Sequence, residues 1–324
     1  MEPETGLAPA PPAVPPPSKL RFVFLNDRGL RAGWRFLIFL VILTPILLAS
    51  GAGFSLLLHA IYGPGPRALA FSAWPTALED LAQFIPVVLA SWIMSRIEHR
   101  RAGVYGLPLQ RSAVSRFIVG YVAWGFLPLT LVLLIMRALG VFSFGTPGLS
   151  LSAGLYWAGA WGVAFLLVGL QEDYLTRGYA LYTLADGIGF WPAAIVLALL
   201  FGWGHTDNPG ETKIGIIGTL LFALFAAMTL RRTGNLWLAV GAHAGWDWGQ
   251  SYFYGVNDSG IPAAGHLFNP PPPHGPIWLS GGTVGPEGSI VTLIVWGLMF
   301  LGFIVFYKPP PDLAEGQIIE TGGS

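Results

Sequence analysis

The chain contains no cysteine, and only 10% of its 324 residues are charged. The absence of cysteine excludes disulfides, thiolate-bound zinc, iron–sulfur clusters and thiol nucleophiles. The net charge is zero, with 17 basic and 17 acidic residues, so no basic field points to a nucleic acid as partner. Residues 1–18 contain neither a basic segment nor an apolar segment, so we expect no cleavable signal peptide.

Apolar residues dominate what is present. Hydrophobic residues make up 53% of the chain, which includes 13 tryptophans, and this exceeds the usual content of a soluble domain. The composition predicts an all-α, polytopic integral membrane protein, with about eight transmembrane helices around a polar intramembrane cavity. We expect a transmembrane helical domain over residues 31–308, with its motif core at about 150–250. It would lie between disordered tails over residues 1–30, on the cytosolic side, and 309–324.

Eight apolar runs are expected to cross the lipid bilayer. They lie at about 34–61, 77–97, a run ending near 139, 153–170, 191–205, 213–230, a run starting at 235, and 289–307. Basic residues cluster before the first run, between the second and third, and after the sixth. By the positive-inside rule this pattern predicts a multi-pass protein of the inner membrane with both termini in the cytoplasm.

Three charged residues stand at the end of the fourth apolar run, namely Glu172, Asp173 and Arg177. An ionisable side chain in a bilayer costs about 2.5–3.5 kcal/mol on insertion scales, so such residues indicate a functional site by default. Asp173 and Arg177 are four residues apart with the acid first, which favours a pair on one helix face. Glu172 points about 100° away and has no such local partner. We therefore expect Glu172 to carry the chemistry.

Two further polar pairs occur in later runs. Phe201 and His205 share one helix face, and so do His243 and Asp247. The bundle must turn these faces inward, away from lipid, so both histidines can meet Glu172. In a wet cavity a carboxylate can take a proton from water, an imidazole can orient the oxygen, and a further group can stabilise an oxyanion. This combination favours attack of water on an amide.

These segments resemble, in the same order, the three motifs of the CPBP family. That family comprises CAAX proteases, including the type II CAAX prenyl endopeptidases, and bacteriocin-processing or immunity (Abi-like) proteins. The matching segments are Glu172-Asp173-x-x-x-Arg177, Phe201-x-x-x-His205 and His243-x-x-x-Asp247. The resemblance covers about residues 150–250, and a weaker similarity extends to a glycine-rich stretch at 278–288.

The resemblance implies an intramembrane endopeptidase that acts on a membrane-associated peptide or protein, and the composition and topology are typical of a bacterial protein. The roles it implies are water activation by Glu172, water binding by His205, oxyanion stabilisation by His243 and Asp247, and shaping of the first motif by Asp173 and Arg177. Asp173 stands where the family more often has a second glutamate. An ionised Asp247 cannot donate a hydrogen bond as an asparagine amide can, so it could instead orient His243, be protonated or bind a metal.

The sequence leaves open whether the site binds a metal ion. Two histidines and one carboxylate are a known zinc ligand set, so Glu172, His205, His243 and Asp247 are the candidate ligands for a divalent metal such as zinc. No His-Glu-x-x-His motif supports this, and no other cofactor is indicated.

Two other function classes remain. A membrane scaffold or bacteriocin-immunity protein could use the same fold without cutting a bond, and a proton-coupled transporter could use the same carboxylates and histidines as a relay. A rhomboid-like serine protease is disfavoured, because Ser55 is isolated from the polar cluster. Glu172 and His243 both lie toward the cytoplasmic ends of their runs, so we expect the cavity to open toward the cytosolic leaflet.

Overall fold

The computed structural model describes residues 23–26, 29–63, 71–101 and 105–308. The tail expected at 309–324 lies outside these residues, as does most of the tail expected at 1–30. Within the latter, strands β1 (Leu25–Asn26) and β2 (Gly29–Leu30) pair antiparallel just before the first long helix.

Helices occupy all eight of the expected runs in the described part of the chain. They are α2 (Ala32–Tyr62), α3 (Ala73–Ile97), the run of α4 (Arg111–Val119), η2 (Gly120–Phe126) and α5 (Leu127–Ala138), α6 (Leu151–Arg177), α8 (Phe190–Gly204), α9 (Lys213–Thr233), α10 (Trp237–Asp247) with η3 (Trp248–Phe253), and α12 (Ile290–Phe306). Five helical runs are long and apolar enough to cross a membrane, and α8 and α12 are shorter apolar helices. The expected all-α, multi-pass membrane fold is confirmed.

The remaining elements are short. They are α7 (Tyr179–Ile188), α11 (Ile277–Ser280), η4 (Pro286–Gly288), and strands β3 (Thr146–Pro147) and β4 (Phe268–Asn269), which pair antiparallel. The pairing of β3 with β4 fixes the start of α6 against the long connection that precedes α12.

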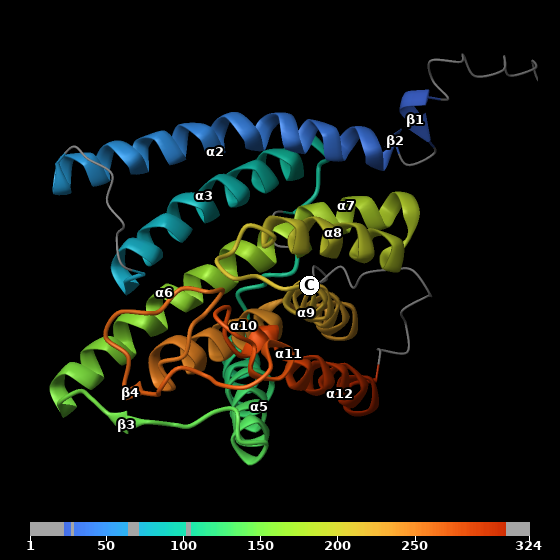
Figure 1. The fold of residues 1–324 in the computed structure, drawn as a ribbon. Coiled ribbons are helices and arrows are strands. Elements are labelled where there is room, and N and C mark those ends of the chain that lie inside the picture. Colours follow the sequence, from blue (N-terminus) through green and yellow to red (C-terminus); the bar gives the residue numbers. More distant parts are fainter. Residues whose placement is uncertain (1–22, 27–28, 64–70, 102–104, 309–324) are drawn as a thin grey trace, which may run out of the picture.

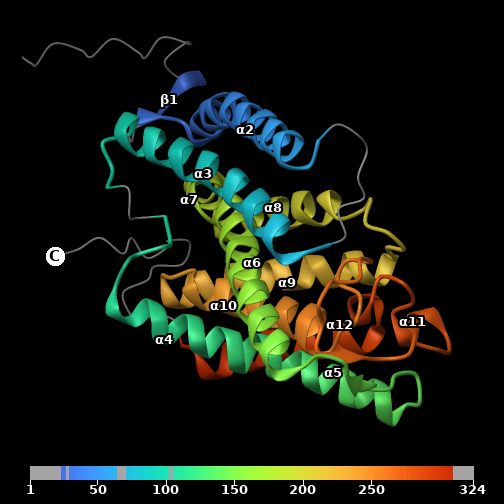
Figure 2. The ribbon, with the colours of Figure 1, turned by 90° about the vertical axis from the view of Figure 1, so that its left-hand side faces the viewer.

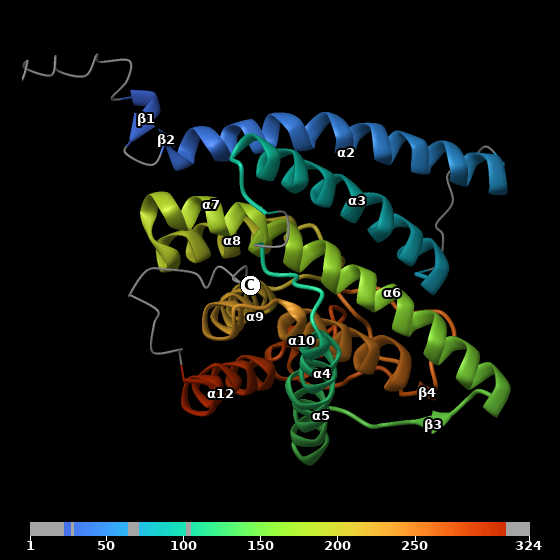
Figure 3. The ribbon, with the colours of Figure 1, turned by 180° about the vertical axis from the view of Figure 1, so that it is seen from behind.

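The helices form three layers (Figures 1, 2 and 3). Helices α2 and α3 lie side by side in one outer layer, and α6, α7 and α8 form the middle layer. Helices α9, α10, α12 and the α4–α5 run form the other side. Helix α6 therefore packs between α3 and α10, and the charged residues near its C-terminal end are enclosed by the bundle.

Helix α7 was not expected from the sequence. It follows α6 after a break at Gly178, and together they form one apolar run of 38 residues, Leu151–Ile188. Glu172 thus lies 16 residues before the end of this run, or about 24 Å of helical rise from it. His205 follows the start of α8 at Phe190 by 15 residues, or about 22 Å. The two residues therefore lie at similar helical distances from the turn between α7 and α8.

Glycines allow α10 to pack very closely against α4 and η2. A Cβ atom on Gly241 would overlap the carbonyl oxygen of Phe117, and one on Gly245 would overlap that of Tyr121. Only glycine permits such a backbone approach, as in other tightly packed membrane helices. His243, two residues from each glycine, lies on the opposite face of α10 and is directed toward α6.

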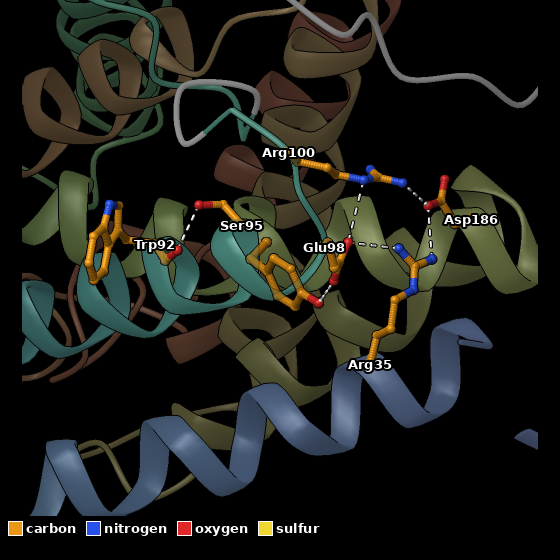
Figure 4. Close-up of polar contacts among 7 residues, drawn as sticks. Arg35, Trp92, Ser95, Glu98, Arg100 and Asp186 are labelled. Carbon is orange, nitrogen blue, oxygen red and sulfur yellow. Dashed lines mark hydrogen bonds and ion pairs between the residues drawn. The ribbon is translucent and has the colours of Figure 1, made fainter. Parts of the chain in front are cut away.

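An ion-pair cluster joins α2, α3 and α7 at the arginine-rich end of the bundle (Figure 4). Arg35 of α2 lies 3.0 Å from Glu98, just after α3, and 2.9 Å from Asp186 of α7. Arg100 contacts the same two acids at 3.4 and 3.2 Å. The hydroxyl of Tyr179 donates a hydrogen bond to Glu98. This arginine cluster fixes the outer layer to the middle layer.

Candidate active site

The pair expected at the end of α6 is present and fully enclosed. Asp173 and Arg177 are 0% and 2% exposed, and a guanidinium nitrogen of Arg177 donates to Asp173 Oδ1 at 2.6 Å. Arg177 Nε also donates to the carbonyl of Ala223 on α9, and the guanidinium lies 5.0 Å from the centre of the Phe201 ring on α8. Arg177 therefore connects α6 to α8 and α9.

Glu172 has a different environment from the residue that follows it. Its side chain keeps 27% of its exposure and faces a cavity, and its nearest ionisable contact is His243 Nε2, 3.6 Å from Glu172 Oε2. The hydroxyl of Thr176 donates to the backbone carbonyl of Glu172 and not to its carboxylate. As expected from helix geometry, Asp173 forms the ion pair with Arg177 and Glu172 does not.

His243 lies at the centre of the polar groups. Its Nε2 is 3.6 Å from Glu172 Oε2 and also 3.6 Å from Asp247 Oδ2, while its Nδ1 is 3.6 Å from Asp173 Oδ2. These distances exceed those of a formed hydrogen bond, so the groups face one another with room for small shifts. The ring of Phe222 packs edge-on against the imidazole at 5.1 Å. Both ring nitrogens of His243 therefore face carboxylates.

His205 caps the C-terminal end of α8. Its Nδ1 lies 2.7 Å from the carbonyl oxygen of Phe201, a contact that places the ring proton on Nδ1. In that tautomer Nε2 is an acceptor for a water molecule or a ligand for a metal. The ring also packs against Phe201 at 4.5 Å between centres.

One cavity of about 460 Å³ brings the expected residues together. Glu172, His205, His243 and Asp247 all line it, whereas Asp173 and Arg177 lie behind its wall. Five further acids line the cavity, namely Glu79, Asp80, Glu211, Asp258 and Glu287. In the part of the chain that the structure describes, no lysine or arginine lines it. The polar intramembrane cavity expected from the sequence is thus present, and it is strongly acidic.

The cavity extends toward the connections 205–212 and 254–289, which contribute Asn208, Glu211, Asp258 and Glu287 to its lining. These two connections pack on one another, since a Cβ atom on Gly260 would overlap the carbonyl oxygen of Pro209. If the arginines expected in the cytoplasm lie there, both connections lie on the other side of the membrane. This orientation conflicts with the expected opening of the cavity toward the cytosolic leaflet, and both stay predictions.

A second cavity of about 350 Å³ meets the first at the candidate site. Both are lined by Gln83, Glu172, Phe201 and His205. The remaining walls of the second cavity are mostly apolar, and they come from α2, α6, α7 and α8. Glu172 and His205 therefore lie where a polar cavity joins an apolar one.

The four candidate zinc ligands do not form a compact set. Among the described residues, the group of metal-binding side chains whose ligand atoms all lie within 4.8 Å of one another is Asp247, Asp258 and Glu287. Glu172, His205 and His243 do not belong to it. The geometry therefore does not fit a zinc ion held by these two histidines and a carboxylate.

The acids at 211, 258 and 287 were not expected in the site. They lie in polar connections, and only tertiary packing brings them to the cavity. Burial is the main cause that raises the pKa of Glu287 to about 8 and that of Asp258 to about 6, and the proximity of Asp258 raises the pKa of Glu287 further. Burial also raises the pKa of Glu211. The one local signal was the unusual position of Glu287 inside a glycine-rich stretch.

Comparison with known families agrees with this geometry. Residues 154–249 match the family model described as type II CAAX prenyl endopeptidase Rce1-like. The matched segment contains all seven named residues of the three motifs. No curated protein matches the chain. The match of residues 154–249 therefore supports a CAAX-type intramembrane protease of the CPBP family.

Proposed function

We propose that this protein is an endopeptidase that cuts a peptide bond of a membrane-associated peptide or protein with a water molecule activated by Glu172. The observation that carries the proposal is the contrast at the end of α6. Arg177 neutralises Asp173, whereas Glu172 faces both cavities without a guanidinium partner. An unneutralised carboxylate at such a junction is suited to act as a general base.

In this mechanism Glu172 takes a proton from water while the oxygen attacks the scissile carbonyl carbon. The tetrahedral intermediate then collapses as the carbon–nitrogen bond breaks, and Glu172 returns the proton to the leaving amine nitrogen. His205 supports the first step because its Nδ1 contacts the Phe201 carbonyl, which leaves Nε2 to accept a hydrogen bond from the attacking water. The reaction therefore consumes one water molecule and needs no further reactant.

His243 would stabilise the oxyanion. Asp173 faces its Nδ1, and Glu172 and Asp247 face its Nε2, an arrangement that suits an imidazolium with a proton on each ring nitrogen. An Nε2–H group aimed at the reacting carbonyl would donate to the negative oxygen of the transition state. Asp247, 3.6 Å from Nε2, serves to orient the ring, a task that an ionised aspartate can perform without donating a hydrogen bond.

The apolar cavity would take the membrane-embedded part of the substrate. Its lining includes Phe36, Leu40 and Leu43 of α2 and Leu197 and Leu200 of α8. Such a wall favours an apolar segment or chain through burial of apolar surface. The scissile bond would then lie beside Glu172, where the two cavities meet.

The orientation in the membrane follows from the same pattern of arginines. Arg96 lies in the last turn of α3, Arg100 and Arg101 follow this helix, and Arg231 and Arg232 lie in the last turn of α9. With these groups on the cytoplasmic side of the inner membrane of a bacterial cell, both termini are cytoplasmic and the acidic cavity faces the other side.

A survey of new peptide termini by mass spectrometry tests the proposal. Membranes of cells expressing wild type, Glu172→Gln or Glu79→Gln at equal levels are compared, since Glu79 lines the same cavity and undergoes the same chemical change. We expect termini that appear with wild type and Glu79→Gln and are absent with Glu172→Gln. Identical surveys for all three, with each protein stably inserted, would contradict hydrolysis and favour a scaffold or immunity role.

A further inference from the structure

Three carboxylates from separate segments converge at one side of the cavity. Asp247 lies at the end of α10, Asp258 lies in the connection after η3, and Glu287 lies in η4. A carboxylate oxygen from each lies within 4.8 Å of the other two. Asp247 and Asp258 are 6% and 8% exposed, so the group is withdrawn from bulk solvent. This acid triad includes two residues that the proposed mechanism does not use.

The protein holds the two loop carboxylates in fixed orientations. The hydroxyl of Ser251 donates to Asp258 Oδ2 at 2.7 Å, and the backbone amide of Ser259 donates to Glu287 Oε2 at 3.1 Å. Asp258 therefore keeps its second oxygen for another partner. Fixed ligand oxygens of this kind, oriented by surrounding hydrogen bonds, are characteristic of metal sites.

An independent observation comes from Gln250, which is completely buried beside the triad. Its amide nitrogen donates to the carbonyl of Asn257 at 2.7 Å, and its side chain also contacts the carboxylate of Glu287. Its Oε1 atom is buried and has no hydrogen-bond partner. A buried amide oxygen without a donor is costly, and a cation is one of the few groups that can satisfy it next to three acids.

The charge of the surroundings favours a cation for the same reason. No lysine or arginine of the described residues lines this cavity. His243, which can carry a positive charge, contacts the triad through Asp247. Buried like charges are strongly unfavourable unless they are compensated. Oxygen-only ligands suit hard cations such as Mg²⁺, Ca²⁺ or Mn²⁺, and they do not suit zinc bound by histidine.

We propose that Asp247, Asp258 and Glu287 bind one hard divalent cation, with Gln250 Oε1 as a further ligand. The bound ion joins the end of α10 to the connection 254–289, which forms one wall of the cavity. It also removes negative charge beside the site while leaving Glu172 outside the ligand set. The proposal does not rest on proteolysis, because binding is measured without substrate.

The test is a titration of the full chain with MnCl₂ in detergent after treatment with EDTA, with free Mn²⁺ followed by its electron paramagnetic resonance signal. We expect wild type to bind about one Mn²⁺ per chain and excess Ca²⁺ to displace it. Asp258→Asn and Glu287→Gln should weaken binding by about 10- to 100-fold or more. The matched control Glu79→Gln, an acid of the same cavity outside the triad, should bind like wild type.

A further variant keeps the test decisive if the losses come from misfolding. Gln250→Glu adds a carboxylate at the unpartnered oxygen and should tighten Mn²⁺ binding by several-fold. The proposal is overturned by the absence of saturable binding to wild type, or by equal binding to the folded Asp258→Asn and Glu287→Gln proteins. It is also overturned if Gln250→Glu binds no more tightly, or if binding is lost in His205→Ala and kept in Glu287→Gln, because the ion would then lie at the histidines.

Discussion

Acidic side chains have opposite environments in two regions of the bundle. In the arginine cluster, Glu98 and Asp186 each contact both Arg35 and Arg100, and three helices are held together there (Figure 4). The cavity around Glu172 has seven acidic residues in its lining and no lysine or arginine among the described residues. Acids of the first kind brace the fold, whereas those of the second kind remain available for a proton, a substrate or a cation.

The boundary between these two classes passes between neighbouring residues of α6. Asp173 is completely buried against Arg177, and Glu172 is partly exposed to the cavity. A matched pair of amide substitutions at these two positions should therefore separate catalysis from stability.

The largest effect is expected for Glu172→Gln. Loss of the general base should lower the rate of peptide cleavage by about 100- to 10,000-fold, because glutamine cannot accept the proton from water. Thermal unfolding in detergent should stay close to wild type, since the residue forms no ion pair with arginine. The measurement is cleavage of a substrate found in the survey of termini. Near-normal cleavage by a folded Glu172→Gln protein would remove this residue from the mechanism.

Asp173→Asn should affect stability more than the rate of peptide cleavage. Removing one partner of a buried ion pair leaves Arg177 as an uncompensated charge and should lower the free energy of unfolding by about 3–5 kcal/mol. Equilibrium unfolding in detergent with increasing denaturant measures this, with Glu172→Gln as the matched control. A stability equal to that of the control would mean that Arg177 finds other partners, such as the Ala223 carbonyl, sufficient.

Much of the site could be predicted from sequence because its signals are local. The separation of four residues between Asp173 and Arg177 and between His243 and Asp247 places each pair on one helix face, and the structure has both contacts. The apolar runs predicted the helices for a similar reason, since a bilayer leaves the backbone few other choices. Helix α7 was missed because its ten residues, Tyr179–Ile188, are too few for a span and follow a glycine break.

The remainder depends on contacts that no local pattern encodes. Asp258 and Glu287 are 29 positions apart in an irregular connection, and their convergence on Asp247 requires that this connection fold back over the end of α10. The position of Glu172 and the shape of the cavity depend on tertiary packing for a related reason. The depth of Glu172 depends on α7, and the outer wall depends on how the connections 205–212 and 254–289 pack.

Within the arginine cluster, Glu98→Gln should have an intermediate effect. Its side chain is only 9% exposed, and it accepts contacts from Arg35, Arg100 and Tyr179. Loss of charge-assisted hydrogen bonds should lower stability by about 1.5–3 kcal/mol. Cleavage by the folded fraction should be unchanged, because Glu98 lines neither cavity at the site. A large loss of cleavage at unchanged stability would contradict the division of roles between the two ends.

The smallest effect is expected for Arg100→Gln. Arg100 and Asp186 keep 31% and 30% of their side-chain exposure, so solvent and salt weaken their interaction, and Arg35 still contacts Asp186 in the variant. The loss of stability should be about 0–1 kcal/mol. It should disappear at about 1 M salt, where the screening length falls to roughly 3 Å. Asp173→Asn should keep its effect under the same conditions, because its partner is buried. Equal salt dependence of the two variants would show that burial does not separate the two classes of acids.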